Sequence, residues 1–174
     1  MVVWLIGLSG AGKTTLGRLL HQRLAAQRSN LVFLDGDILR DVWGDELGHT
    51  IEARNLNAHR ISHLCRMLDR QGIHVIAAVL SMFPEWQKWN RANFSSYFEV
   101  FLDVPIDVLR RRDDKGLYRR AEAGELDNVV GLDIPFPRPA SSDLVLEGSD
   151  VELPPDALVD RIVQSLPAPL AMQE

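Results

Sequence analysis

Short apolar runs of strand length alternate along this chain with stretches of helical periodicity. The runs expected to form strands are Val2 to Ile6, Leu31 to Leu34, Ile73 to Leu80, Tyr97 to Leu102 and Leu144 to Leu146. Between them, apolar residues recur at helical spacing, as in the stripe from Leu16 to Leu24. Strands that are apolar almost throughout are typical of a parallel sheet covered on both faces. The pattern predicts a three-layer α/β fold with a mostly parallel sheet of about five strands.

One region departs from this alternation. Residues 113–139 are rich in charge and proline, and a short helix at Tyr118 to Ala123 is their one periodic segment. A loop this long inside a compact domain is usually functional, so we expect a mobile lid there. The last residues, 167–174, are expected to form a frayed tail.

Composition limits the classes of protein to consider. A length of 174 residues predicts one domain, residues 1–174. A net charge of -5 argues against broad nucleic-acid binding, and no apolar run is long enough to span a membrane. Cys65 is the one cysteine, so the composition suits a reducing compartment, and we expect the cytoplasm. A small anionic ligand remains compatible with this charge, because it needs only a local positive pocket.

The clearest chemical signal is a phosphate-binding loop between the first strand and the first helix. Its pattern, G-x-x-x-x-G-K-[ST], is met by Gly7-Leu8-Ser9-Gly10-Ala11-Gly12-Lys13-Thr14. Backbone amides of such a loop point at phosphate oxygens, and the following helix adds its positive end. Lys13 is expected to reach the outer phosphates and Thr14 to ligate Mg²⁺. The predicted nucleotide contacts are Gly7, Ser9, Gly10, Ala11, Gly12, Lys13, Thr14 and Thr15.

Two carboxylates follow the second predicted strand. Asp35 and Asp37 flank Gly36, and in an open parallel sheet ligands bind beyond the carboxyl ends of the strands. Both carboxylates should therefore face the phosphate loop. One can hold Mg²⁺ while the other accepts a proton from an acceptor hydroxyl, as phosphoryl transfer requires.

A GTP-binding switch is the distant alternative. A GTPase needs a guanine-specifying Asn-Lys-x-Asp after a later strand, and the sequence has none. Residues 41–44 match the switch pattern D-x-x-G only weakly. The pattern thus favours a kinase over a switch.

Basic residues gather where the lid is expected to begin. Arg112 and Lys115 flank Asp113 at its hinge. Such cations can neutralise charge on a transferring phosphoryl group and on an anionic acceptor.

Three segments together resemble the adenylyl-sulfate kinase family. They are the phosphate loop, the Asp-Gly-Asp-x-x-Arg turn at residues 35–40, and residues 112–125, which contain Lys-Gly-Leu-Tyr. The likeness covers nearly the whole domain, from Val2 to Leu146. It implies a P-loop kinase that transfers the γ-phosphoryl of ATP, with Mg²⁺, to an alcohol group, the 3′-hydroxyl of adenylyl sulfate, in sulfate activation.

Matching positions imply roles for individual residues. Asp37 is the implied base, Lys13 a second catalytic residue, and Asp35 is implied to order Mg²⁺ or the acceptor. Arg112 is implied to lie near the ATP base. The residues implied to hold the acceptor are Arg40, Arg54, Asn57, Ser81 and Lys115, together with Asp35.

Two substrate positions depart from the family pattern. Where the family clamps the adenine of adenylyl sulfate between two aromatic residues, this chain has His49 and Val129. Stacking on a base is worth about 1–3 kcal/mol per aromatic side chain, so their loss weakens that clamp. The sequence therefore leaves two acceptors open, adenylyl sulfate and another nucleotide conjugate such as a cytidine diphosphoramidate. It also leaves a homodimer open.

Overall fold

A single parallel sheet forms the centre of the molecule. The computed structural model describes residues 1–44, 48–113 and 115–167. Its strands are β1 (Val2–Ile6), β2 (Leu31–Asp35), β3 (His74–Val79), β4 (Tyr97–Leu102) and β5 (Leu144–Leu146), in the spatial order β2-β3-β1-β4-β5. All four pairings are parallel. The predicted strands are confirmed, with ends that differ by no more than one residue.

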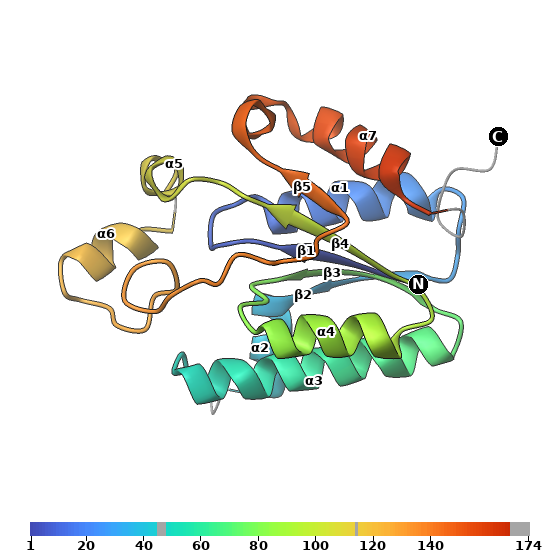
Figure 1. The fold of residues 1–174 in the computed structure, drawn as a ribbon, viewed down its shortest axis with the longest axis horizontal. Helices are drawn as coiled ribbons and strands as arrows, with labels where there is room; N and C mark the ends of the chain where they lie inside the picture. Colours follow the sequence, from blue (N-terminus) through green and yellow to red (C-terminus); the bar gives the residue numbers. More distant parts are fainter. Residues whose placement is uncertain (45–47, 114, 168–174) are drawn as a thin grey trace.

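Helices cover both faces of this sheet, as Figure 1 shows. One layer contains α1 (Lys13–Ala25) and α7 (Pro155–Ser165), and the other contains α2 (Gly36–Trp43), α3 (Ile51–Arg70) and α4 (Pro84–Asn93). The remaining helical segments are α5 (Ile106–Arg111), α6 (Leu117–Glu122) and the 3-10 helix η1 (Gly148–Glu152). The three-layer α/β prediction is confirmed.

Alternation along β1 divides the hydrophobic core into two halves. Val3 and Leu5 are buried with residues of α1 and α7, whereas Val2, Trp4 and Ile6 are buried with residues of α3. Successive side chains of a strand point to opposite faces, so a fully apolar strand supplies both halves. The central strand is thereby fixed from both sides, and the loop that follows it begins from a rigid support.

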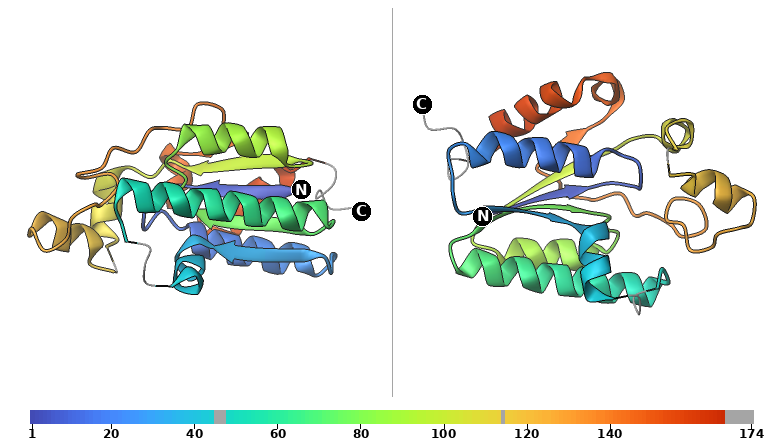
Figure 2. Two further views of the ribbon diagram at one scale, coloured as in Figure 1. Left: turned by 90° about the horizontal axis from the view of Figure 1, so that it is seen from below. Right: turned by 180° about the vertical axis from the view of Figure 1, so that it is seen from behind.

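The expected lid lies at the carboxyl ends of the strands. Helices α5 and α6 and the loop after them project beyond the sheet in all three views (Figures 1 and 2). The predicted short helix is α6. Val130 and Ile134, from the loop after α6, form a small buried apolar cluster with Met82.

The expected tail lies outside the described residues from 168 onward. Within the described part of the chain, no helix combines the length and the apolarity needed to cross a membrane.

Candidate active site

The phosphate loop, residues 7–14, connects β1 to α1 at the carboxyl edge of the sheet. Gly12 has φ 93°, a left-handed conformation that glycine adopts without a steric penalty. A Cβ built on Gly7 would lie 2.9 Å from the carbonyl oxygen of Leu102, so the backbone of β4 approaches too closely for a side chain there. These two constraints explain why the curled loop has glycine at both positions.

Lys13 places its ammonium inside this loop. Its Nζ donates a hydrogen bond to the carbonyl oxygen of Leu8 at 2.7 Å. Desolvation lowers the pKa of Lys13 to about 8, and the nearby carboxylates of Asp37 and Asp35 oppose this shift. The loop therefore holds a cation whose charge would be better compensated by bound phosphate than by a single carbonyl.

Thr14 and Asp35 join the loop to the end of β2. The Thr14 hydroxyl donates to Oδ2 of Asp35 at 2.6 Å. Oδ1 of Asp35 caps α2 by accepting from the backbone N–H of Asp37 at 2.9 Å. A hydroxyl and a carboxylate in contact are the oxygen ligands that Mg²⁺ prefers, so these residues fit the predicted metal.

Asp37 lies on the first turn of α2 and faces the lid. Its Oδ2 is 3.1 Å from Nζ of Lys115, and both side chains are exposed, by 79% and 75% respectively. An exposed ion pair contributes little to stability, so a ligand can readily replace either partner. The predicted base and the predicted lid lysine thus meet across the site.

Arg40 and Arg54 come from different helices and hold the same loop. Nη1 of Arg40 donates to the carbonyl oxygen of Gly48 at 2.8 Å, and Nε of Arg54 donates to that of His49 at 2.9 Å. Nη2 of Arg54 also donates to the carbonyl oxygen of Asn128, in the lid, at 2.8 Å. Backbone carbonyls of residues 48 and 49 therefore hold the two predicted acceptor-binding arginines beside one loop.

His49 stands close to these arginines. Burial lowers the pKa of its imidazole below the usual value, and the positive charges of Arg40 and Arg54 lower it further. The ring is therefore neutral at pH 7. A neutral imidazole can stack on a base.

Asn57 is more buried than the two arginines, and Ser81 is half-buried as they are. Asn57 is 8% exposed and accepts a hydrogen bond from Nε1 of Trp43 at 3.1 Å. Ser81 follows β3 with φ 52°, and its hydroxyl accepts from Nε1 of Trp4 at 3.0 Å. A left-handed residue other than glycine or asparagine is strained, and such strain concentrates at functional sites.

Val129 has a different environment from the other predicted acceptor residues. It is 3% exposed and belongs to the core on the α1 side of the sheet. Oδ2 and Oδ1 of Asp133 accept from the backbone N–H groups of Asn128 and Val129, each at 2.5 Å, which holds the loop in this form. The structure therefore places the Val129 side chain in the core, whereas His49 is exposed.

The structure also shows one lid contact that the sequence analysis missed. The hydroxyl of Tyr118, on α6, donates to the carbonyl oxygen of Ser9 in the phosphate loop at 2.8 Å. Burial raises the pKa of this phenol to about 12, so it remains a donor at any physiological pH. Tyr118 is the one tyrosine of residues 113–139, and this was the available signal in the sequence for a contact between the lid and the phosphate loop.

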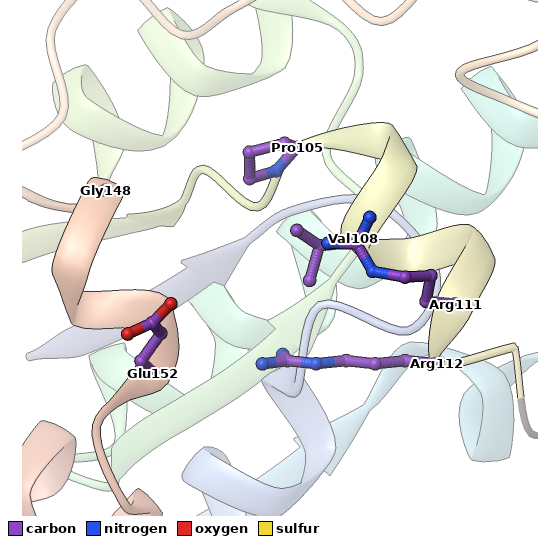
Figure 3. Close-up of a pocket in the computed structure, with 6 residues that line it drawn as sticks. All are labelled: Pro105, Val108, Arg111, Arg112, Gly148 and Glu152. Carbon is purple, nitrogen blue, oxygen red and sulfur yellow. The ribbon is translucent and has the colours of Figure 1, made fainter.

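Arg112 lines a cavity of about 280 Å³ beside the phosphate loop (Figure 3). The other lining residues come from η1, from α5 and from the residue that precedes α5, and are Pro105, Val108, Arg111, Gly148 and Glu152. Arg112 extends across the floor of this cavity towards Glu152 (Figure 3). That Arg112 lies near the base of a bound nucleotide stays a prediction.

Comparison with known proteins decides the family. The family model described as adenylylsulphate kinase matches residues 1–147. The chain belongs to this family. It is 40% identical over 168 residues to an adenylyl-sulfate kinase of Paraburkholderia xenovorans, with 95% of this chain and 92% of the relative covered. The family is one of ATP-dependent phosphotransferases, so the predicted recognition and enzyme class are confirmed.

Two further relatives bear on the donor and the acceptor. The APS kinase CysC of Mycobacterium tuberculosis, solved in complex with AMPPNP and APS, superimposes with a TM-score of 0.85 at 32% identity, covering 94% of this chain and 95% of that one. A cytidine diphosphoramidate kinase of Campylobacter jejuni is 39% identical over 148 residues, covering 85% of this chain and 86% of the relative. Family membership and the AMPPNP complex support ATP as the nucleotide bound by the phosphate loop.

Because the pKa of Lys13 is lowered, we expect nucleotide binding to be coupled to proton uptake and to depend on pH. At pH 8.5 much of the free protein has a neutral Lys13, and phosphate anions favour its charged form. We expect ATP binding at this pH to take up a substantial fraction of a proton. Calorimetric titrations in two buffers of different ionisation enthalpy measure it as a difference in heat. Equal heats would contradict the expectation, and Lys13→Arg, which stays charged, is the control.

Proposed function

We propose that this protein is an adenylyl-sulfate kinase, which transfers the γ-phosphoryl of ATP to the 3′-hydroxyl of adenylyl sulfate. The observation that supports this most directly is the position of Asp37. Its charge acts on Lys13 in the phosphate loop and also on Arg40, His49 and Arg54. One carboxylate therefore stands between the donor residues and the predicted acceptor residues, as a base for phosphoryl transfer must.

The proposed reaction assigns one task to each group around the phosphate loop. Lys13 and the amides of residues 7–14 hold the donor phosphates, and the Thr14 hydroxyl with Asp35 would hold Mg²⁺. Bound Mg²⁺ supplies charge neutralisation on the phosphate oxygens. Asp37 accepts the proton of the acceptor hydroxyl while the oxygen of that hydroxyl bonds to the γ-phosphorus. The bond between this phosphorus and the bridging oxygen of ADP breaks at the same time.

The lid has the proposed task of excluding water. Lys115 exchanges Asp37 for an anionic oxygen of the substrates, while Tyr118 keeps α6 against the phosphate loop. Exclusion of water prevents loss of the phosphoryl group to hydrolysis.

The proposed acceptor site contains Arg40, Arg54, Asn57, Ser81 and Lys115, with His49 beside the two arginines. The identity to a cytidine diphosphoramidate kinase, together with the buried Val129, gives the second candidate acceptor its support. That relative phosphorylates a different nucleotide conjugate with the same family scaffold, so the choice of acceptor needs a direct assay.

Formation of the phosphorylated acceptor from ATP and Mg²⁺ tests the proposal. We expect turnover with adenylyl sulfate at micromolar concentrations, and a much lower kcat/KM with cytidine diphosphoramidate. A reversed preference would transfer the assignment to the second candidate, and no turnover with either would overturn both. A single domain, a homodimer and a cytoplasmic location remain predictions.

A further inference from the structure

A hydrogen bond between Trp43 and Asn57 fixes the orientation of an amide on the acceptor side of the site. Nε1 of Trp43, the last residue of α2, is 3.1 Å from Oδ1 of Asn57, on the buried side of α3. An indole N–H can only donate, so the atom of Asn57 that faces Trp43 must be the amide oxygen. The oxygen and nitrogen of an amide have nearly the same shape, so it is this contact that assigns which of them faces Trp43.

The remaining polar atom of this amide is a donor that lacks a protein partner. Among the residues that the structure describes, none accepts a hydrogen bond from Nδ2 of Asn57, although the side chain is only 8% exposed. This N–H₂ group is therefore available to donate to a bound molecule. A ligand oxygen that approached Nδ2 would accept this hydrogen bond.

The surroundings of Asn57 favour an anionic oxygen as that ligand atom. Arg54 precedes Asn57 by three residues on α3, and residues with this spacing are neighbours on a helix surface. Arg40, on α2, lies close to Arg54, because its charge lowers the pKa of Arg54 and both charges lower the pKa of His49. The Trp43–Asn57 bond thus joins the two helices whose arginines would attract the same anion.

We propose that Trp43 is a positioning residue for the acceptor, acting through Asn57. By holding Oδ1, it makes Asn57 present only its N–H₂ group to the acceptor, where it donates to an anionic oxygen beside Arg54. This inference rests on the proposed function, since it requires that the acceptor binds between α2 and α3. It adds a tryptophan that matched no motif to the residues that set acceptor affinity.

Trp43→Phe tests the proposal because it removes the N–H and keeps an aromatic ring. Without the indole the amide is free to turn, and we expect the KM for adenylyl sulfate to rise about tenfold, as loss of one oriented hydrogen bond predicts. The kcat and the KM for ATP should stay within about twofold, because neither depends on this amide.

Trp86→Phe, on α4, is a matched control at another helix contact of α3. Nε1 of Trp86 donates to Oδ1 of Asn55 at 2.6 Å, so this is also a tryptophan–asparagine bond between a neighbouring helix and α3, but on its exposed side. We expect its loss to change neither KM. An equal rise of the acceptor KM in both variants would overturn the proposal, as would an unchanged KM in Trp43→Phe.

Asn57→Asp provides a second variant should Trp43→Phe fail to fold. The carboxylate still accepts from Trp43 but offers no donor and repels an anion, so the acceptor KM should rise at least tenfold, about the effect of one lost hydrogen bond. A wild-type KM in this variant would overturn the proposal. The wild-type assay distinguishes failure of the proposed function from failure of the role of Trp43. If the wild type turns over no acceptor, both are refuted. If the wild type is active and the variants are unaffected, only the role of Trp43 is refuted.

Discussion

Replacement of Lys13 by alanine should reduce kcat by about a thousandfold, the upper range for loss of one preorganised charge at a transferring group. The ammonium is already held inside the phosphate loop by the Leu8 carbonyl, so ATP meets a cation in place rather than one that must reorganise. The rate at which phosphorylated acceptor forms at saturating ATP and Mg²⁺ measures the effect. A variant that keeps a tenth of the wild-type kcat would contradict the assigned role.

Stability measurements separate this loss from unfolding. The pKa of Lys13 falls from an ordinary 10.5 to about 8 in the folded chain, so between these values the unfolded chain binds more protons. Lys13 therefore weakens folding below pH 8, and this cost disappears as the pH rises through that window. At pH 7 the Tm of Lys13→Ala should equal or exceed that of the wild type. Lys88→Ala, which removes an exposed lysine of α4, should alter neither kcat nor Tm.

Local patterns in the sequence were sufficient to predict the donor half of the site. A buried strand, a glycine-rich turn with Lys13, and an amphipathic helix form a contiguous segment, so its structure depends on neighbours in the chain. The same holds for Asp35, which caps the helix that begins at the next residue. Such features depend on short-range geometry that spacing alone reveals.

The contacts between elements far apart in the chain were beyond a single sequence. Tyr118 meets Ser9 across 109 positions and Trp43 meets Asn57 across 14, and no periodicity specifies either pair. The inward position of Val129 depends on Asp133, which caps two backbone amides of the lid loop. Each of these depends on how separate elements pack, which is decided by the fold as a whole.

Replacement of Asp37 by asparagine should lower kcat by about 10² to 10⁴, the usual contribution of a positioned general base. Asparagine has the same shape and can still accept from Lys115, so the lid contact is preserved while the proton acceptor is lost. The KM for adenylyl sulfate should change much less than kcat. Single-turnover assays with enzyme in excess over ATP measure the chemical step directly.

The pH of this experiment decides whether it reports on the base alone. The carboxylate of Asp37 raises the pKa of Lys13, so its removal lowers that pKa further and weakens ATP binding near pH 8. A lower pH favours the charged form of Lys13 in both proteins, so the difference in affinity for ATP should shrink as the pH falls below 8. Asp41→Asn, one turn along α2 on the exposed surface, is the matched control and should keep wild-type kcat. If Asp37→Asn kept that rate as well, the proton would leave by another route, and Asp37 would serve only to hold Lys115.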